Sequence, residues 1–360
     1  MLVTPDLHVR GVLLPGYDER DLWVRAGTIA AGPVPGVETV ARSGFVLPGL
    51  VDAHCHIGLS PAGIHHDHAG QLAQAYTERD VGALLLRDAG SPVDTRWLQH
   101  RDDVPRLIRA GRHLARTGRY LRDLALELEP EQLPDAIEAQ ARAGDGWVKI
   151  VGDWIDRSVG DLAPEWPRET VFQAVRRAHA AGAKVAVHTF GEEALPDLIE
   201  AGVDSIEHGT GLTDDLIGAM AARGIALVPT LINVDNFPAI AESASRFPAY
   251  AARMRRLHES SRARLRAAYD AGVPIYAGTD AGGQLPHGRV VDEIRALHDA
   301  GLSASDALAA GSWGAREWLG CPSLSPGAPA DFVVYDRDPR TDLAVLAEPA
   351  RIVLRGKVVR

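Results

Sequence analysis

Residues 47–60, which read LPGLVDAHCHIGLS, constrain the fold of this chain more than any other stretch. An apolar run passes through a Pro-Gly pair into residues 50–55, and this predicts a short buried strand that ends in a glycine-containing loop. Alternate side chains of a strand share one face, so His54 and His56 point to the same side and Cys55 to the other. Two imidazoles at a strand end predict a metal site. On these residues alone, an inert hydrogen-bonded pair is the more frequent explanation of so short a motif.

The body of the chain alternates short apolar runs with longer helical patterns, which is typical of βα units and a parallel sheet. We expect strands at residues 50–55, 82–87, 106–109, 147–151, 184–188, 204–207, 225–229 and 274–278. We expect helices at residues 131–143, 168–181, 192–201, 214–223 and 239–271, several of them followed by a glycine that suits a helix C-cap. Eight such units favour a (β/α)8 barrel, whose active site lies at the carboxyl ends of the strands.

The two ends of the chain have a different residue pattern from the body. Short β-branched segments separated by turn residues fill residues 1–46 and 321–360. They suggest one small sheet domain built from both termini, beside a larger body at residues 47–320. At 360 residues the chain has room for a barrel of roughly 250 residues and such a second unit.

Composition excludes several classes of partner. The formal charge of -10 argues against nucleic acid and against an anionic membrane, because both select basic surfaces. Apolar runs stay short of a membrane span, and the first residues lack the pattern of a secretory signal. Two cysteines are too few for a disulfide framework. We therefore expect a cytoplasmic protein with a small-molecule substrate, and a homo-oligomer remains open.

Four polar residues stand at the ends of later predicted strands. Lys149 lies inside an apolar segment, His188 and His208 close two β-branched runs, and Asp280 sits in a glycine-rich loop. Each has an ordinary explanation: Lys149 could reach the surface or pair with Asp153, the histidines could be satisfied polar groups, and Asp280 could be a turn residue. Their order along the chain is what makes them candidates for one site.

These motifs resemble those of the amidohydrolase superfamily, and the resemblance covers essentially the whole chain. The matching patterns are PGLVDAHCH at residues 48–56, VKI at 148–150, VH at 187–188, EHGT at 207–210 and GTD at 278–280. The resemblance implies a TIM barrel with a small β-sandwich formed by both termini. It also implies two divalent metals, a carboxylated Lys149 that bridges them, and the metal ligands His54, His56, Lys149, His188, His208 and Asp280.

The implied ligand set suggests a chemistry. Mixed nitrogen and oxygen donors suit zinc best, with iron, manganese or cobalt as alternatives. The resemblance implies that a metal-bridging hydroxide attacks an amide C–N bond while Asp280 moves its proton to the leaving group. The same centre would serve a lactonase or a phosphotriesterase. A different class, a barrel in which the metal is structural or holds a ligand, is disfavoured because such a site needs no positioned base.

The substrate is less constrained than the metal site. Prolidase-like relatives carry a T-G-G-H-G loop and a tyrosine after P-T-L, whereas residues 117–121 read TGRYL and Val234 replaces the tyrosine. We therefore expect Xaa-Pro and Xaa-Arg dipeptides to be poor substrates and a cyclic amide, an N-acyl compound or a lactone to be better. Arg119 and Tyr120 could still hold a carboxylate. The candidate substrate residues are His113, Arg119, Tyr120, Asn233 and His287, the last in a P-H-G element that resembles prolidase-like and imidazolonepropionase-like members.

Three further groups of polar residues are expected to be ordinary. His65, His66 and His68 follow the first strand, where a solvated loop is favoured over an accessory metal site or a place in the pocket. Glu207 should point away from its neighbouring ligand and give structural support. A solvated helix face is expected for Arg253, Arg255, Arg256, Arg262, Arg264 and Arg266.

Overall fold

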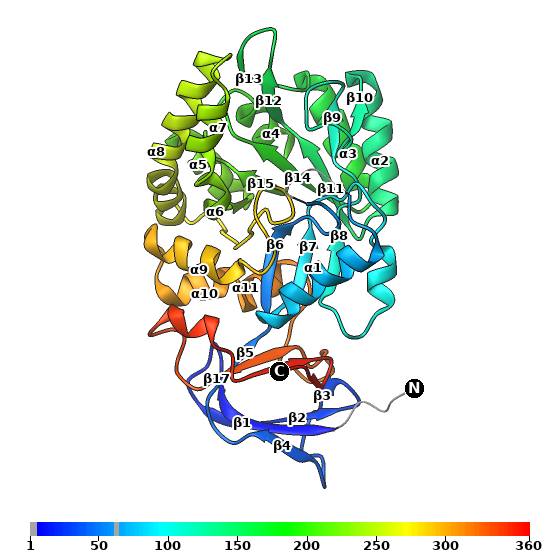
Figure 1. Cartoon of the computed structure of the whole chain (residues 1–360), viewed down its shortest axis with the longest axis vertical. Coiled ribbons are helices and arrows are strands. Elements are labelled where there is room, and N and C mark those ends of the chain that lie inside the picture. The colour runs from blue at the N-terminus through cyan, green and yellow to red at the C-terminus, as the bar shows by residue number, and fades with distance from the viewer. Residues whose placement is uncertain (1–5, 61–64) are drawn as a thin grey trace.

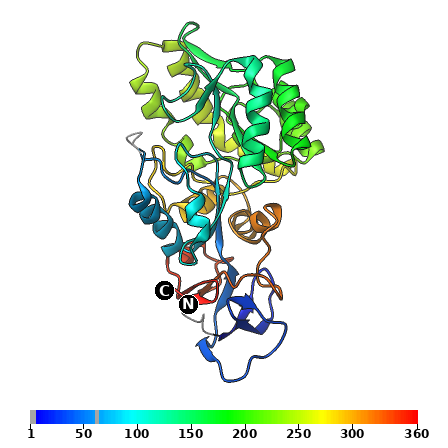
Figure 2. The same cartoon turned by 90° about the vertical axis from the view of Figure 1, so that its right-hand side faces the viewer.

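The computed structural model describes residues 6–60 and 65–360. Segments from both ends of the chain form one sheet of eight strands, in the order β19-β18-β17-β5-β1-β2-β3 with β4 beside β1. Figures 1 and 2 place this sheet at one end of the molecule, next to the larger α/β body. Its strands are β1 (Leu7–Leu13), β2 (Glu19–Arg25), β3 (Thr28–Ile29), β4 (Glu38–Ala41), β5 (Phe45–Pro48), β17 (Phe332–Tyr335), β18 (Arg351–Leu354) and β19 (Lys357–Val358).

The pairing of β5 with β17 joins the two ends of the chain. Phe332 pairs with Pro48 and Tyr335 with Phe45 in an antiparallel register. Apolar side chains from both ends, among them Val24 and Phe332, are buried together in a core of their own. The shared sheet accords with the short β-branched segments expected at the two termini. The second layer that a sandwich needs, and the boundaries at residues 46 and 321, stay predictions.

The body is a mixed α/β fold, as the alternating pattern predicts. Seven of the eight expected strands are present within two residues of their expected bounds. Three form a parallel sheet: β6 (Leu50–Cys55), β7 (Ala83–Asp88) and β8 (Arg106–Arg109). Four more lie in a sheet of order β10-β9-β11-β14-β15-β16, which also holds the unexpected β9 (Leu114–Arg116) and β10 (Leu126–Leu128) beside β11 (Trp147–Val151), β14 (Lys184–Thr189), β15 (Ser205–His208) and β16 (Ala226–Val228).

The eighth expected strand, at residues 274–278, is wrong as a regular strand. The segment has only an isolated parallel bridge between Ile275 and Leu227. Pro274 has no N–H to donate, and this weakens the ladder at the start of the segment. Its carbonyl and that of Ala277 still accept hydrogen bonds from Leu227 N and Ala53 N, each at 2.8 Å. The segment therefore lies between β16 and β6, which are the last and first regular strands of the body.

Helices fill most of the connections and lie around the strands (Figure 1). The long helix expected at residues 239–271 is two helices, because the residue before Pro248 is disfavoured in the α conformation and Phe247 lies outside it, with φ -128° and ψ 74°. The helices are α1 (His68–Asp80), α2 (Leu133–Ala143), α3 (Arg168–Ala180), α4 (Leu195–Ala201), α5 (Asp214–Arg223), α6 (Leu231–Val234), α7 (Phe237–Ser243), α8 (Pro248–Asp270), α9 (Val290–Asp299), α10 (Ala304–Ala310) and α11 (Trp313–Trp318). Short 3-10 turns occupy η1 (Arg96–His100), η2 (Pro130–Gln132) and η3 (Leu343–Ala347).

The histidine cluster after β6 is not simply a loop. Asp67 caps α1, since its carboxylate accepts a hydrogen bond of 2.9 Å from Gly70 N, and His68 is the first residue of that helix. The ring of His68 packs 4.5 Å from that of Trp97. The chain at His65 forms a bridge with Leu59. Capping by Asp67 is the local signal that distinguishes this helix start from a loop.

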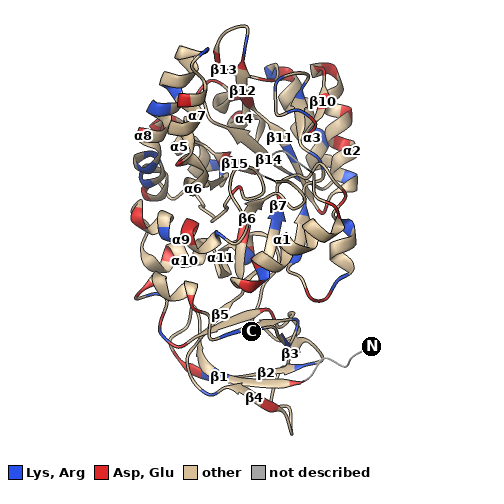
Figure 3. Cartoon of the chain, in the orientation of Figure 1, with Lys and Arg blue, Asp and Glu red and all other residues tan. Residues whose placement is uncertain are grey.

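The arginines of α8 are not a purely solvated face. Arg253 contacts Glu193 at 2.7 Å, Arg256 contacts Glu192 at 2.8 Å, and Arg262 contacts Asp235 at 2.9 Å. These acids belong to the preceding segments of the body, so the basic bands of α8 in Figure 3 tie the helix to its neighbours. Exposed ion pairs of this kind each contribute little to stability. Within the described residues, every helix is too short or too polar to cross a bilayer.

Candidate active site

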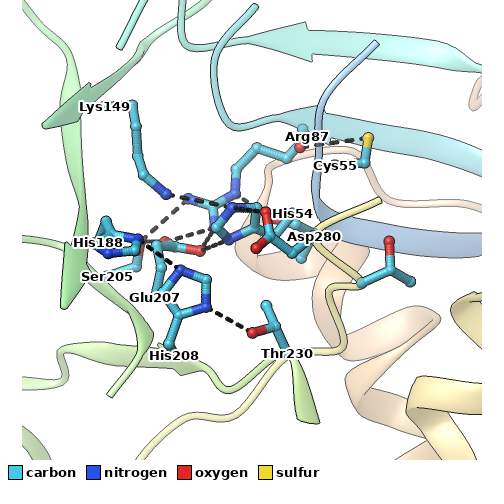
Figure 4. A network of polar contacts seen from close by, with 12 residues as sticks. His54, Cys55, Arg87, Lys149, His188, Ser205, Glu207, His208, Thr230 and Asp280 are labelled. Carbon is cyan, nitrogen blue, oxygen red and sulfur yellow. Dashed lines mark hydrogen bonds and ion pairs between the residues drawn. The ribbon is translucent and has the colours of Figure 1, made fainter. Parts of the chain in front are cut away.

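The six expected ligands come together near the carboxyl ends of the strands. Figure 4 labels five of them, namely His54, Lys149, His188, His208 and Asp280. His54 Nε2 lies 3.3 Å from the Oδ1 atom of Asp280, and His56 Nε2 lies 2.9 Å from the same oxygen. Lys149 Nζ lies 3.4 Å from His54 Nε2. The residues expected as metal ligands, His54, His56, Lys149, His188, His208 and Asp280, all line one cavity.

The donor atoms of this group fit a metal. One ligand atom each from His54, His208 and Asp280 lies within 4.8 Å of the others. His188 Nδ1 lies 2.9 Å from His208 Nε2, while His188 Nε2 is buried without a hydrogen-bond partner. A buried polar atom without a partner is costly and calls for an explanation. Convergent imidazoles beside a carboxylate are the donors that a divalent metal of the zinc type prefers.

Burial also sets the protonation of these groups. It lowers the pKa of His54, holds that of His188 well below its usual range and brings that of His208 to about 3. Burial also lowers the pKa of Lys149 to about 8. Burial alone would raise the pKa of Asp280, but its interactions with His54 and His56 hold it well below its usual range. These shifts favour the neutral form of His54, His188 and His208 and the ionised form of Asp280, which are the forms that bind metals.

Hydrogen bonds behind the histidines fix the orientation of their rings. His54 Nδ1 donates to Glu207 Oε2 at 2.6 Å, and His56 Nδ1 donates to Gly90 O at 2.7 Å. His208 Nδ1 lies 2.7 Å from Thr230 Oγ1. In each case Nδ1 has a partner behind the ring, and Nε2 lies near another candidate ligand. Such partners commonly hold a metal-binding imidazole in one tautomer.

Glu207 supports the site through His54 and not through His208, its neighbour in the sequence. It reaches across to His54 from β15, and Arg87 donates to both of its oxygens at 2.8 Å. Arg87 also donates to Ala53 O at 2.6 Å and lies 4.5 Å above the ring of Trp147. Both charged side chains are essentially excluded from solvent. Sequence reasoning missed Arg87, although an arginine inside the apolar β7 sequence ALLLRD is a visible signal.

Asp280 is held by its surroundings. Asn233 Nδ2 donates to its Oδ2 atom at 2.7 Å, and its own N–H donates to His54 O at 2.7 Å. Asp280 has φ 58°, a left-handed conformation that few non-glycine residues adopt and that is frequent at functional sites. Glu293 accepts from Leu231 N and Ile232 N, at 2.9 and 3.0 Å, and so fixes the short helix α6 that carries Asn233. No motif in the sequence pointed to Glu293 as part of the site.

The candidate substrate residues divide into two groups. His113, Tyr120 and Asn233 line the same cavity of about 210 Å³ as the six candidate ligands. Arg119 lies outside its lining and donates to Asp156 Oδ2 at 2.8 Å, Trp154 O at 3.2 Å and Ala163 O at 3.0 Å.

His287 also lies outside the cavity lining, and its Nδ1 is 2.8 Å from Glu78 Oε1.

The contacts of Arg119 join the two strands of a hairpin, β12 (Asp153–Asp156) and β13 (Asp161–Pro164), that the sequence did not predict. Figure 1 shows this hairpin projecting at the end of the body farthest from the terminal sheet.

Comparisons with known proteins identify relatives over the whole length. A family model described as "Amidohydrolase family" matches residues 45–359. An uncharacterized protein of Mycobacterium tuberculosis (strain ATCC 25618 / H37Rv) is 56% identical over 353 residues, which is 98% of this chain and 95% of that protein. The ochratoxinase of Aspergillus niger is 24% identical over 366 residues, 88% of this chain and 75% of the ochratoxinase.

Solved structures show the same fold. A Xaa-Pro dipeptidase with bound methionine in its active site superposes with a TM-score of 0.81 at 23% identity, over 99% of this chain and 100% of the other. The A. niger ochratoxinase superposes with a TM-score of 0.80 at 19% identity, over 99% of this chain and 96% of the other. At such identities the likeness concerns the fold alone.

Proposed function

The chain belongs to the amidohydrolase family, and from that premise we propose that it is a binuclear metal-dependent hydrolase that cleaves an amide C–N bond of a small molecule. The observation that carries this proposal is the convergence of buried histidines, one of them with a buried nitrogen that has no hydrogen-bond partner, on the carboxylate of Asp280. Cyclic amides and N-acyl compounds are the proposed substrates. Zinc is the proposed metal, because the donor set mixes imidazole and oxygen ligands.

Each ligand has a proposed place. His54, His56 and Asp280 would hold one ion and His188 and His208 the other, with a carboxylated Lys149 between them. The neutral form of an amine is the one that takes up carbon dioxide, and burial lowers the pKa of Lys149 toward neutrality. When bound, two divalent ions would supply a hydroxide nucleophile at neutral pH and polarise the substrate carbonyl.

The protein's own groups would handle orientation and protons. Asp280 is ionised, so its carboxylate can accept a proton from the nucleophile and return it to the leaving nitrogen. Asn233 steadies Oδ2 of that carboxylate while Oδ1 faces His54 and His56. The Glu207 and Gly90 acceptors keep Nε2 of these histidines directed into the cavity.

We further propose that residues 47–320 form a (β/α)8 barrel beside a sandwich of residues 1–46 and 321–360. Hydrogen bonds of residues 274–281 to both β16 and β6 support this arrangement, because they link the last regular strand of the body to the first. The barrel accounts for the position of the ligands, since barrel enzymes place their active sites at the carboxyl ends of the strands.

Two other hydrolytic functions rank lower. A Xaa-Pro or Xaa-Arg dipeptidase needs a cation for the substrate carboxylate, and Arg119 is engaged with Asp156 and two carbonyls. A lactonase or phosphotriesterase would use the same centre, but the family assignment favours C–N bonds. A non-catalytic ligand-binding barrel would have no use for an ionised carboxylate held in a left-handed conformation.

Metal content tests the centre directly. Protein produced with added zinc should contain about two divalent ions per chain, measured by elemental analysis after gel filtration. Lys149→Ala should lose one or both ions, because a ligand that bridges two metals is removed, and a short carboxylic acid should restore part of the content. Lys357→Ala is the matched control, since Lys357 pairs with Asp102 away from the cavity.

One ion or none in the wild-type protein, together with an unmodified Lys149 by mass spectrometry under native conditions, would refute the binuclear centre. Full metal content in Lys149→Ala would refute the bridging role. Hydrolysis of an amide by the zinc-loaded protein, abolished by a chelator and restored by zinc, is the expected result for the activity itself.

A further inference from the structure

Resting on the proposed amide hydrolysis, we infer that the substrate is a neutral amide that carries an aromatic ring and no free carboxylate. The inference comes from the part of the cavity beyond the candidate metal ligands. Many of the residues that line it there are aromatic or aliphatic, and among the described residues none is a lysine or an arginine.

The aromatic wall begins directly beside the histidines. Trp154 on β12 has its ring 5.2 Å from that of His188, and Phe190, just after β14, has its ring 4.3 Å from the same histidine. Tyr120 lies 4.7 Å from Trp154 and 5.9 Å from His188. Aromatic rings attract one another at centroid separations of roughly 4.5 to 7 Å. A substrate ring attached near the scissile bond would therefore meet a wall of aromatic partners.

The rim of the cavity continues this apolar character. Leu121, between β9 and β10, is 49% exposed although it is a large aliphatic residue, and it lines the cavity. Ile240 on α7 and the largely buried Tyr250 on α8 also line the cavity. Covering an exposed apolar side chain with an apolar substrate group is favourable in proportion to the area removed from water. The exposure of Leu121 thus points to an apolar occupant.

Charge in the lining argues against an anionic substrate. Among the described residues that line the cavity, Lys149 is the only lysine or arginine, and its amine lies 3.4 Å from His54 Nε2 within the candidate metal centre. Arg119 is bound to Asp156 and two carbonyls, and Arg253 is bound to Glu193 and Asp161. A carboxylate at the far end of the cavity would lose water without gaining a cation, which is strongly unfavourable.

The neutral polar groups of the lining suit an amide instead. Outside the metal centre the cavity offers the side chains of Asn233, Ser243 and Gln284 and the hydroxyls of two tyrosines. Burial raises the pKa of Tyr250 to about 12, so its hydroxyl stays protonated and can donate. The volume of about 210 Å³ exceeds the roughly 150 Å³ of a cavity that binds benzene, so one ring and an amide fit.

The aromatic wall is also fixed in place. Arg119 donates hydrogen bonds to Trp154 O on β12 and to Ala163 O on β13, and so links both strands of the hairpin that carries Trp154. Arg119 is therefore a positioning residue for the aromatic wall. Pre-formed pockets lose less conformational entropy on binding than pockets that must order themselves.

A set of simple amides tests the inference. Acetanilide and N-methylbenzamide place a ring on either side of the C–N bond; 4-acetamidobenzoate and 4-(methylcarbamoyl)benzoate add a carboxylate at the far end of each ring; N-propylacetamide has no ring. With zinc-loaded protein we expect kcat/KM for at least one neutral aromatic amide to exceed that for its carboxylated partner and for N-propylacetamide by about tenfold or more. Calorimetric binding to the metal-free protein should follow the same order.

A charge introduced at the rim supplies the matched variant. Leu121→Arg should raise binding and kcat/KM for the carboxylated partner several-fold relative to the neutral amide, because the new guanidinium can reach a carboxylate there. Leu121→Gln, similar in length but uncharged, should give no such gain. Circular dichroism and thermal unfolding would show that both variants fold.

The outcomes separate the inference from the proposed function. Preference of the wild-type protein for the carboxylated or the aliphatic amide, in turnover or in binding, would overturn the inference while leaving amide hydrolysis intact. Binding in the expected order without any turnover would support the inference and count against the hydrolytic function. Failure of all five compounds to bind or react at millimolar concentration would overturn the inference.

Discussion

Replacing Asp280 with asparagine should lower kcat by about 100-fold or more, the scale of a lost general acid-base group. The carboxylate is ionised, with its pKa held well below the usual range, and it is oriented by His54, His56 and Asn233. An amide has the same shape but cannot accept the proton. The measurement is steady-state kinetics on the best amide from the substrate set, with metal content determined on the same sample.

The control for this variant is Asp235→Asn. Asp235 is the C-cap residue of α6 and lies only two residues after Asn233, but its carboxylate pairs with Arg262 on α8. We expect near-normal kcat from this control. If Asp280→Asn itself keeps near-normal kcat with both ions bound, Asp280 is not the proton carrier. His113, a buried histidine of the cavity lining that is not among the six candidate ligands, would then be tested by His113→Asn.

The second large effect should come from Arg87→Met, which removes the cation beneath Glu207. Glu207 is fully buried, and Arg87 donates to both of its oxygens. Removing one partner of a buried ion pair typically costs about 3 to 5 kcal/mol, because the remaining charge is left uncompensated. Urea unfolding of the metal-free protein measures this loss. Metal affinity should also fall, by roughly 10- to 100-fold, since Glu207 orients the ring of His54.

Two further variants identify the cause of this loss. Arg168→Met removes an exposed arginine that contacts Asp197 and Glu200, and it should cost less than about 1 kcal/mol. The double variant Arg87→Met/Glu207→Gln has no unpaired charge and should recover part of the stability, yet it should not recover metal affinity. Wild-type stability and metal affinity in Arg87→Met would show that the buried pair supports neither the fold nor the site.

The six candidate ligands could be named from the sequence because they stand in short motifs that resemble those of the family. A strand alternates its faces, so the spacing of His54 and His56 sufficed to place both on one side, and the structure brings both rings to Asp280. The family prediction is confirmed over residues 45–359. Arg87 and Glu207 pair across a sequence separation of 120 residues, and no local pattern reports such a contact.

Substrate-side residues were harder to predict because loops carry them. Arg119 stood in a loop where it could have bound a carboxylate, but its partner Asp156 belongs to a hairpin that the sequence did not predict. The same hairpin brings Trp154 to the cavity. The eighth strand was misread for a related reason, because a proline at its start leaves few ladder bonds although its neighbours hold it in place.

The pairing of β5 with β17 has a consequence for synthesis of the chain. β5 leads directly into β6, which carries His54, and its antiparallel partner β17 follows about 284 residues later. A contact between such distant segments has a high entropic cost and forms late in folding. While the ribosome is still adding residues before 332, the nascent chain therefore exposes one edge of β5. Unpaired strand edges favour aggregation, so we expect chaperone protection to matter most during this interval.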